Sequence, residues 1–566
     1  MQTALKTGKD VQTGRILVKT KETQSGRGTG ESFFSGVLVL TIAGLLVKAM
    51  GMFFKIPMNY IVGDTGMGYY NAAYTIYTFF YMLSTAGLPT AVSILVSSAR
   101  AEGRRNQSRR ILQMALWLFC GIGILGSGVM FVFADELAAW IGAPPSAYSI
   151  LAAAPTLFFI CIASALRGYF QGCSRMVPTA VSQFLEAFCK VGAGILGALY
   201  GIRMGEDAPM VAARAVFGLT LGSAVSMLYL ILAGLYSRQS SSCRPSDFTE
   251  KPSIDSRRTI LAGLASIALP ITVSSAVMSL TGMIDAVLIQ RLLQQNGMTQ
   301  EAATTLYGNY TSLAVPMFNL PPVLVYPIAY AMVPLLTRYR TERDSEKRAQ
   351  GLIGSALRMA VLIGAPCALG MSVLSGEILT LLYRSASAET AAPLLTLLAP
   401  SSLLVCILAV TNSALQSIGK AGLPVLSMLA GAGVKILTTL WLIPGMGITA
   451  APVSTFFCYL TVTAMNLAFL LQSSGLRPDM GRTFFRPMTA AGVCAMSALA
   501  AQRFLQYVLP EKLSVLPAIG IAAVVYCLLI RSMGVLTEED MALLPGSARL
   551  RRWLGLQDKT EKILEK

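Results

Sequence analysis

The sequence contains no histidine, which excludes an imidazole general base, a Ser-His triad and a histidine metal site. It also lacks the G-x-x-x-x-G-K-[ST] phosphate-binding loop, so ATP hydrolysis by this chain is not expected. Its ten cysteines are scattered and no two have C-x-x-C spacing, which argues against a disulfide framework or a zinc site. We therefore expect a protein that is not an enzyme and that holds no metal and no cofactor.

Charged residues are scarce as well. They make up 13% of the 566 residues, whereas hydrophobic residues make up 54% and the mean hydropathy is +0.61. Such a chain cannot fold around one water-soluble core, and its apolar excess requires lipid as solvent. The net charge of +17 lies in short clusters between apolar runs rather than on one polar face, so nucleic acid is not an expected partner.

Long apolar stretches begin at Ser32 and alternate with short polar breaks along the chain. Each is roughly twenty to thirty residues long, enough for a helix to span a hydrocarbon core about 30 Å thick. The pattern predicts an all-α integral membrane protein with about fourteen transmembrane helices. The predicted helices start near Ser32, Gly68, Ile111, Tyr148, Pro178, Met210, Thr259, Leu306, Ser355, Ala391, Leu423, Ile448, Phe485 and Val515.

The basic clusters predict how these helices are oriented. Lys and Arg concentrate in both tails and in residues 100–110, 238–258, 338–348 and 477–482, which all fall on one side. The opposite loops hold little beyond Arg203, Arg291, Arg384, Arg503 and Lys512. Because basic loops tend to stay in the cytoplasm, we expect both termini to be cytoplasmic.

An internal duplication divides the chain. Four residues recur 245 positions later: Pro155, Cys161, Gln171 and Lys190 as Pro400, Cys406, Gln416 and Lys435. Two bundles of six helices that enter the membrane in the same direction are typical of transporters that rock about a central site, and a duplicated scaffold without transport is the alternative. The predicted plan is a disordered cytoplasmic tail (1–31), a six-helix bundle (32–236), a cytoplasmic linker (237–258), a second bundle (259–472), a helix pair (485–533) and a cytoplasmic tail (534–566).

Charged residues deep in a span are the best pointers to a site, because each costs about 2.5–3.5 kcal/mol at the bilayer centre unless it faces protein or water. Lys48 and Lys55 lie in the first span, seven residues and about 10.5 Å apart on one helix face, which Asn59 continues. This span contains no acidic residue. The three residues are predicted to line a cavity that binds an anion, with snorkelling of the lysines as the alternative.

Five further charged residues are candidates. Lys190 lies near mid-membrane with Glu186 one turn below it, which leaves both an ion pair and a substrate contact open. Its repeat counterpart Lys435 has no acidic neighbour on its own helix. Arg167 is either an interfacial anchor or a substrate contact, and Asp285 is either a structural acid or a site for a coupling ion. Because the deep charges include lysines, the expected substrate is anionic, such as a pyrophosphate.

Four stretches carry a family resemblance. They are residues 48–70 (KAMGMFFKIPMNYIVGDTGMGYY), 84–93 (STAGLPTAVS), 167–172 (RGYFQG) and 178–190 (PTAVSQFLEAFCK). The chain resembles the polysaccharide transporters of the multidrug/oligosaccharidyl-lipid/polysaccharide (MOP) exporter superfamily, which includes sporulation proteins and lipid II flippases. The resemblance implies a MATE/MOP-like fold of fourteen helices that moves a polyprenyl-pyrophosphate-linked saccharide by alternating access.

The resemblance also assigns residues. Lys48 and Lys55 are similar to the cavity arginines that lipid II flippases carry in the first helix, although lysine keeps the charge and loses bidentate phosphate binding. The arginines that those flippases place in the second and eighth helices have no match in residues 70–84 or 306–322. Lys190 stands where similar sporulation proteins carry arginine.

The sequence therefore predicts a flippase of the bacterial cytoplasmic membrane. Its cargo would be a lipid-linked anionic saccharide, either a peptidoglycan precursor or another oligosaccharide, and its partners would be membrane lipids and cell-wall synthases. The predicted substrate contacts are Lys48, Lys55, Asn59, Arg167, Glu186, Lys190 and Lys435, and Asp285 would hold a coupling ion. Two alternatives stay open: a cation-coupled multidrug exporter of the same superfamily, and a non-transporting scaffold for envelope synthesis.

Overall fold

The computed structural model describes residues 27–240, 256–339, 346–475, 479–508, 510–536 and 540. Within these residues it contains helices and no strand, as predicted. The first half contains α1 (Arg27–Thr85), α2 (Leu88–Ala101), α3 (Arg105–Val132), α4 (Ala134–Ile141), the 3-10 turn η1 (Pro144–Ser146), α5 (Ala147–Gly172), α6 (Met176–Arg203) and α7 (Ala208–Ser240).

The second half is interrupted more often. It contains α8 (Arg257–Ile284), the π-helix η2 (Asp285–Ile289), α9 (Gln290–Gln295), α10 (Gln300–Asn309), the π-helix η3 (Tyr310–Ala314), α11 (Val315–Phe318), α12 (Leu320–Tyr339), α13 (Glu346–Val373), α14 (Ser375–Leu382), α15 (Ser385–Ser417), α16 (Gly422–Met446), the 3-10 turn η4 (Gly447–Thr449) and α17 (Ala450–Ser474). The π-helix η5 (Gly481–Phe485), α18 (Arg486–Leu505) and α19 (Glu511–Ser532) follow.

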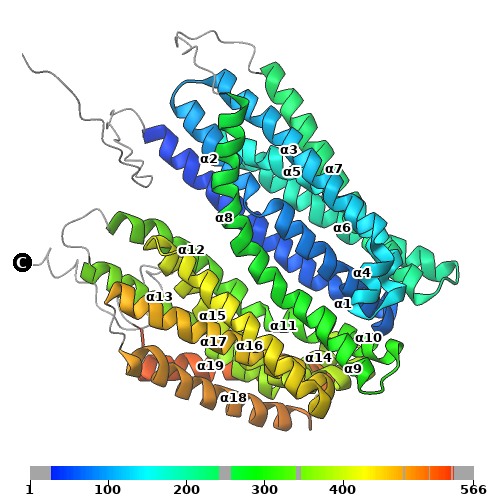
Figure 1. The fold of residues 1–566 in the computed structure, drawn as a ribbon. Helices are drawn as coiled ribbons and strands as arrows, with labels where there is room; N and C mark the ends of the chain where they lie inside the picture. The colour runs from blue at the N-terminus through cyan, green and yellow to red at the C-terminus, as the bar shows by residue number, and fades with distance from the viewer. Residues whose placement is uncertain are drawn as a thin grey trace, which may run out of the picture.

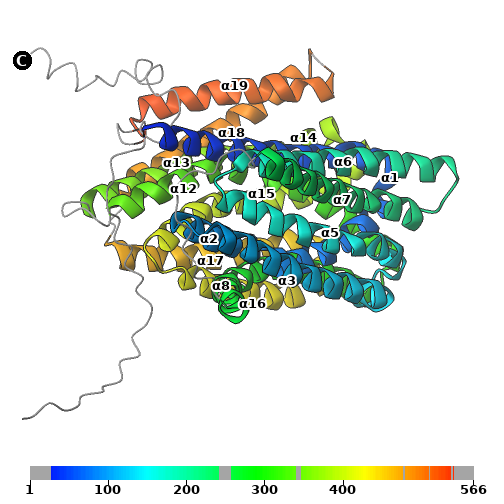
Figure 2. The same cartoon turned by 90° about the horizontal axis from the view of Figure 1, so that it is seen from above.

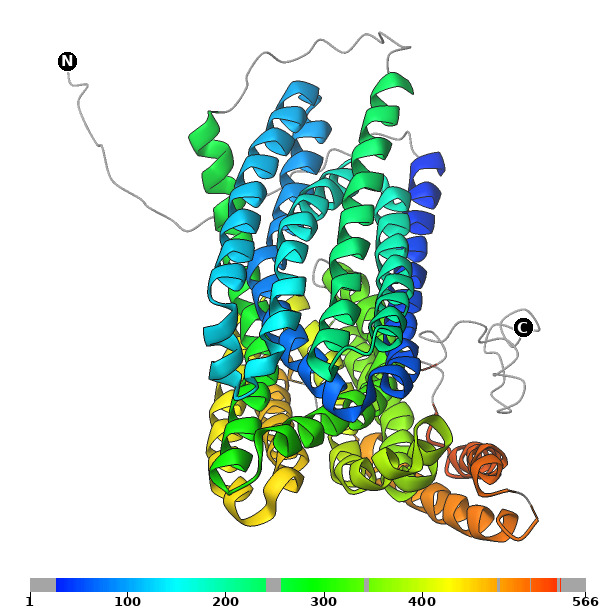
Figure 3. The same cartoon turned by 90° about the vertical axis from the view of Figure 1, so that its right-hand side faces the viewer.

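Ten helical segments of the described residues are long and apolar enough to span a membrane, or eleven if the bent pair Gln300–Phe318 and Leu320–Val333 counts as one. Two of the ten, Ala49–Ala101 and Gly422–Ser474, are 53 residues long, about 80 Å of helix at 1.5 Å per residue. In the first of these, Gly63 has a φ of 76°, a backbone region that favours glycine. The α1 ribbon turns back along this part of the chain (Figure 3). The number of fourteen crossings stays a prediction.

The two halves repeat the same close packing. In the first half α3 packs on α5 and α5 on α7, and in the second half α13 packs on α15 and α15 on α17. A Cβ atom on Gly123 of α3 would lie 3.2 Å from the Cβ of Cys161, and one on Gly364 of α13 would lie 3.2 Å from the Cβ of Cys406. The duplicated cysteines therefore mark equivalent helix contacts, with glycine facing each of them.

Helix α8 contacts both halves. A Cβ on Gly87, which precedes α2, would lie 2.2 Å from the carbonyl oxygen of Ala268 on α8, so the first part of α8 packs against the first bundle. Helix α8 also packs on α16. The predicted boundary between the bundles at 237–258 stays a prediction, since much of that range lies outside the described residues.

The bundles approach each other at one end and diverge at the other (Figure 1). We call the diverging end the basic end: α2, α7 and α12 end there, and α3, α8 and α13 begin there. Seen from above, α18 and α19 lie along the outside of the second bundle (Figure 2), where they pack on α13 and α14. Asp540 is buried and forms an ion pair with Arg358 of α13 over 2.9 Å, so the chain after α19 returns to this bundle.

Candidate functional site

Lys55 reaches from α1 to the second half of the molecule. Its Nζ donates a hydrogen bond to the carbonyl oxygen of Thr311 over 2.8 Å and lies 3.4 Å from Oδ1 of Asn71. Thr311 belongs to the π-helix η3, a conformation that is rare and frequently marks functional sites. Asn71 is itself held by hydrogen bonds from its Nδ2 to the carbonyl of Met67 and to Oγ of Ser312. Both acceptors of Lys55 are neutral, so its charge is solvated by dipoles alone.

Lys190 lies on α6 and faces the returning part of α1. Its Nζ is 4.8 Å from the centroid of the Tyr74 ring, a cation–π geometry. Tyr74 follows Asn71 by about one helical turn, and Lys55 and Lys190 are close enough to interact electrostatically. Among the described residues, no carboxylate forms an ion pair with either lysine. Glu186 lies near enough to act on Lys190 electrostatically but is bonded to Arg167, so the two lysines keep a charge that favours an anion.

Lys48 and Asn59 relate differently to these lysines. The backbone of Lys48 lies in α1, two turns before Lys55 towards the basic end, and its side chain lies outside the described part. Asn59 is buried, and its Nδ2 donates to Oδ1 of Asp64 over 3.0 Å. Within the described part of the chain, Oδ1 of Asn59 has no hydrogen-bond partner. Asn59 therefore lies towards the turn at Gly63, and its predicted substrate contact stays a prediction.

Arg167 and Glu186 form a buried network inside the first bundle. Nη2 of Arg167 lies 2.6 Å from Oε2 of Glu186, and its guanidinium also donates to Ser182 and Ser226. The network joins α5, α6 and α7. Of the two arrangements that the sequence leaves open for Lys190, the ion pair with Glu186 is not formed, because the acid is taken by Arg167. Arg167, which is 7% exposed, is neutralised here.

Lys435 is paired with the candidate coupling-ion residue. Its Nζ lies 2.8 Å from Oδ2 of Asp285, and the lysine is 3% exposed. The pair joins α16 to η2, whose first residue is Asp285. Oδ1 of Asp285 accepts no hydrogen bond from any residue that the structure describes. The ammonium group of Lys435 neutralises this carboxylate and would repel an external cation at Asp285.

A second set of polar contacts joins the two halves at the end opposite the basic end. Asp64, directly after the Gly63 turn, accepts hydrogen bonds from Oγ of Ser387 over 2.9 and 2.8 Å. Arg384 donates to the carbonyl oxygen of Tyr60 over 2.6 Å, and the hydroxyl groups of Thr65 and Thr305 are 2.8 Å apart. We call these bonds the closing contact, made by Tyr60, Asp64 and Thr65 with Thr305, Arg384 and Ser387.

Two glycines allow the backbones to meet beside the closing contact. A Cβ on Gly308 of α10 would lie 2.5 Å from the carbonyl oxygen of Asp64, and one on Gly68 would lie 2.2 Å from that of Thr304. Any larger side chain would push α1 and α10 apart at these points. The geometry therefore closes one end of the interface between the bundles, whereas the basic end diverges (Figure 1).

Sequence reasoning missed several of these residues. Asn71 and Ser312 are buried polar residues in apolar segments, and that feature alone is a signal that could have found them. Asp64 and Ser387 are 323 positions apart and carry no local pattern that links them.

Two similar helical bundles are joined at one end and diverge at the other, and Lys55 of the first bundle bonds the backbone of the second. This arrangement defines a membrane transporter of the two-bundle type. The chain belongs to the family described as Polysaccharide biosynthesis protein, which matches residues 33–340. It is 25% identical to stage V sporulation protein B of Bacillus subtilis (strain 168) over 526 residues, covering 92% of this chain and 99% of that protein.

Solved structures show the same fold. The chain superposes on a lipid II flippase MurJ in an inward closed conformation with a TM-score of 0.65 and 13% identity, covering 88% of this chain and 98% of the other. It also superposes on an inward-facing multidrug resistance MATE family transporter of the MOP superfamily, with a TM-score of 0.56 and 14% identity over 77% of this chain and 98% of the other. The predicted MOP-type fold is thereby confirmed.

Proposed function

We propose that this protein is a flippase that moves a polyprenyl-pyrophosphate-linked saccharide across the bacterial cytoplasmic membrane by alternating access. The observation that carries the proposal is the state of Lys55 and Lys190, which lie between membrane-spanning helices and whose direct contacts among the described residues are a carbonyl, an amide and an aromatic ring. A pyrophosphate offers a stronger acceptor than a carbonyl, an amide or a ring, so it can displace these partners. The similarity to a lipid II flippase supports this cargo class.

Four of the basic candidates divide into two groups by their partners. Lys55 and Lys190 are available to an anion, whereas Arg167 and Lys435 are already paired with Glu186 and Asp285. To bind Arg167 or Lys435, the cargo would have to replace a carboxylate, which costs more free energy than replacing a neutral hydrogen-bond acceptor. These paired residues would therefore bind cargo less readily. We assign pyrophosphate binding to Lys55 and Lys190, with Lys48 two turns nearer the basic end as a first contact.

The closing contact gives the proposed cycle a direction. The basic end would face the cytoplasm, as basic loops do, with both termini on that side. The bundles diverge at that end, so cargo would enter from the inner leaflet while the hydrogen bonds of Asp64 with Ser387 keep the outer end shut. Release would require these bonds to break and the basic end to close.

A cation-coupled multidrug exporter is the second candidate, favoured by the fold shared with MATE transporters and by the buried carboxylate of Asp285. The ammonium group of Lys435 already neutralises that carboxylate, which weakens it as a site for a cationic drug or a coupling ion. Asp285 as a coupling-ion ligand therefore ranks below the lysine site in our proposal.

Depletion of the protein in its host tests the proposed cargo. Lipid extracts are analysed by mass spectrometry, and intact spheroplasts are probed with a membrane-impermeant glycosidase to separate the leaflets. We expect a polyprenyl-pyrophosphate saccharide to accumulate where the glycosidase cannot reach it. If depleted cells instead retained cationic dyes that normal cells export, and the amounts of lipid-linked saccharides were unchanged, the multidrug exporter would be favoured.

A further inference from the structure

A second basic site lies within the first bundle, apart from the lysines between the bundles. It is a cavity of about 520 Å³ at the basic end, lined by residues of α2, α3, α5 and α7 and of the loop after α5. No residue of the second half lines it. The proposed transport function uses none of its residues, so the cavity needs an explanation of its own.

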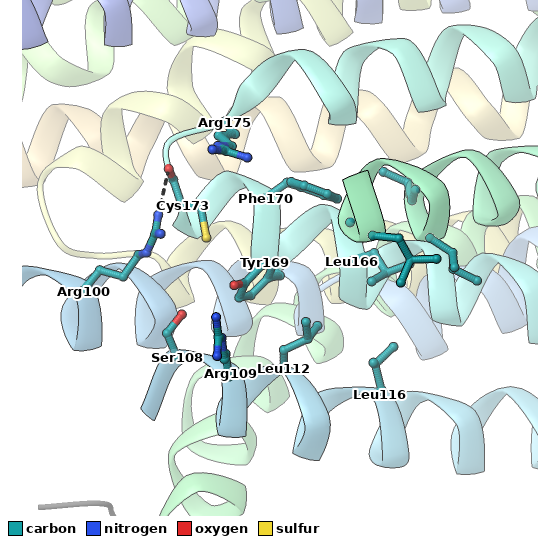
Figure 4. Close-up of a pocket in the computed structure, with 14 residues that line it drawn as sticks. Arg100, Ser108, Arg109, Leu112, Leu116, Leu166, Tyr169, Phe170, Cys173 and Arg175 are labelled. Carbon is teal, nitrogen blue, oxygen red and sulfur yellow. Dashed lines mark hydrogen bonds between the residues drawn. The ribbon is translucent and has the colours of Figure 1, made fainter. Parts of the chain in front are cut away.

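One end of this cavity is basic. Arg100, Arg109 and Arg175, which come from three separate segments, gather around the same space (Figure 4). Arg100 donates to the carbonyl oxygen of Cys173 over 3.3 Å, whereas Arg109 makes no hydrogen bond or ion pair with any described residue. Ser108 adds a buried hydroxyl that lies close to the Tyr169 side chain. These groups offer donors to an anion.

The other end of the cavity is apolar. On α3, Leu112 and Leu116 follow Arg109 by one and two turns, about 4.5 and 10.5 Å further into the membrane. Leu166 and Phe170 of α5 face the same space, and Leu230 of α7 is fully buried beneath it. Donors at the membrane surface followed by apolar side chains at depth match the two parts of a phospholipid.

An adjoining cavity strengthens this match. It shares Arg109 and adds Arg110, Arg257 and Trp117. Trp117 directly follows Leu116 on α3, so its 79% exposed ring lies at the depth of the acyl chain. Clustered basic residues between transmembrane helices are a known form of anionic-lipid site.

We propose that the cavity between α3, α5 and α7 binds an anionic phospholipid of the leaflet at the basic end. Arg100 and Arg109 hold its phosphate, and Leu112, Leu116 and Phe170 contact the first part of an acyl chain. A free phosphate ion would leave the apolar part of the cavity unused. The site is separate from the cargo path because every lining residue belongs to the first half.

Native mass spectrometry of the full-length protein in mild detergent tests the site, with phosphatidylglycerol as the probe. Wild-type protein should retain one phosphatidylglycerol in preference to phosphatidylcholine. The double variant Arg100→Gln, Arg109→Gln should bind it about thirtyfold more weakly, which corresponds to about 1 kcal/mol per arginine. Arg348→Gln is the matched control, because Arg348 is an exposed arginine at the start of α13, the repeat counterpart of α3.

A second variant tests the acyl-chain part without changing charge. Gly234 of α7 lines the cavity, and a Cβ added there meets nothing within 4 Å, so Gly234→Phe can fill the space without a backbone clash. We expect this variant to lose phosphatidylglycerol while keeping all three arginines. The proposal is overturned if both variants bind like wild type, if phosphatidylcholine binds equally well, or if excess inorganic phosphate or undecaprenyl phosphate displaces the bound lipid.

Discussion

The ion pair between Lys435 and Asp285 makes a quantitative prediction about stability. At 2.8 Å and an effective dielectric constant of about 20, the attraction between the two charges is about 6 kcal/mol. Part of this offsets the cost of removing both groups from water, so Lys435→Ala should destabilise the protein by about 3–5 kcal/mol. We expect a destabilisation of about 5 kcal/mol if the carboxylate of Asp285 gains no new hydrogen bond, and its Oδ1 has none from the described residues even in the wild-type protein.

The double variant Lys435→Met, Asp285→Leu should recover most of this loss, because replacing both charges leaves no unpaired group in the interior. Reversible denaturant unfolding in mixed micelles, followed by tryptophan fluorescence, measures Lys435→Ala and, as a cycle, Lys435→Met, Asp285→Leu and the double variant. Lys420→Ala is the control, since Lys420 is exposed and bonds only the hydroxyl of Ser473. A loss below about 1 kcal/mol for Lys435→Ala, or strictly additive losses in the cycle, would refute this reasoning.

Three further predictions concern the end opposite the basic end. Ser387→Ala removes both hydrogen bonds to Asp64 and should raise the fraction of molecules open there, seen as longer spin-label distances across the closing contact. Gly308→Leu should shift the same distances further, because its Cβ would lie 2.5 Å from the Asp64 carbonyl oxygen; unchanged distances would contradict both expectations. A hydrogen bond from Arg214 holds the pKa of Glu206 below its ordinary value of 4.5, so the pair stabilises the protein above that pH and less as pH falls through the lowered pKa. Glu206→Gln should remove this acid-dependent part of a melting curve, and an identical pH profile would count against the pair.

The duplication shows how much of the fold the sequence could predict. The offset of 245 residues relates Cys161 to Cys406, and in the structure each of these cysteines faces a glycine of a neighbouring helix, Gly123 or Gly364. Apolar periodicity likewise predicts helices, because only helices satisfy backbone polar groups in lipid. The number of crossings is harder, since a bent pair such as Gln300–Phe318 and Leu320–Val333 passes as a span only when its two helices are counted together.

The sequence could predict which charged residues belong to the candidate site, but not which residues they contact. Depth in an apolar span identified Lys55, Lys190 and Lys435 from sequence alone. Their partners come from other helices: Asp285 is 150 positions from Lys435, and Thr311 is 256 positions from Lys55. Helical spacing within one segment suggested a pair of Glu186 with Lys190, but tertiary packing gave Glu186 to Arg167. Only the fold separates lysines that are free to bind an anion from those that are neutralised.

The most direct test of the proposed flippase is transport by purified protein in proteoliposomes. The cargo is a fluorescent polyprenyl-pyrophosphate disaccharide, and a membrane-impermeant quencher reports its leaflet. We predict that wild-type protein and Lys420→Gln move the lipid, that Lys55→Gln with Lys190→Gln abolishes transport, and that Lys55→Arg retains it. Transport at the wild-type rate by the Lys55→Gln, Lys190→Gln protein would contradict the assignment of these lysines as the pyrophosphate site.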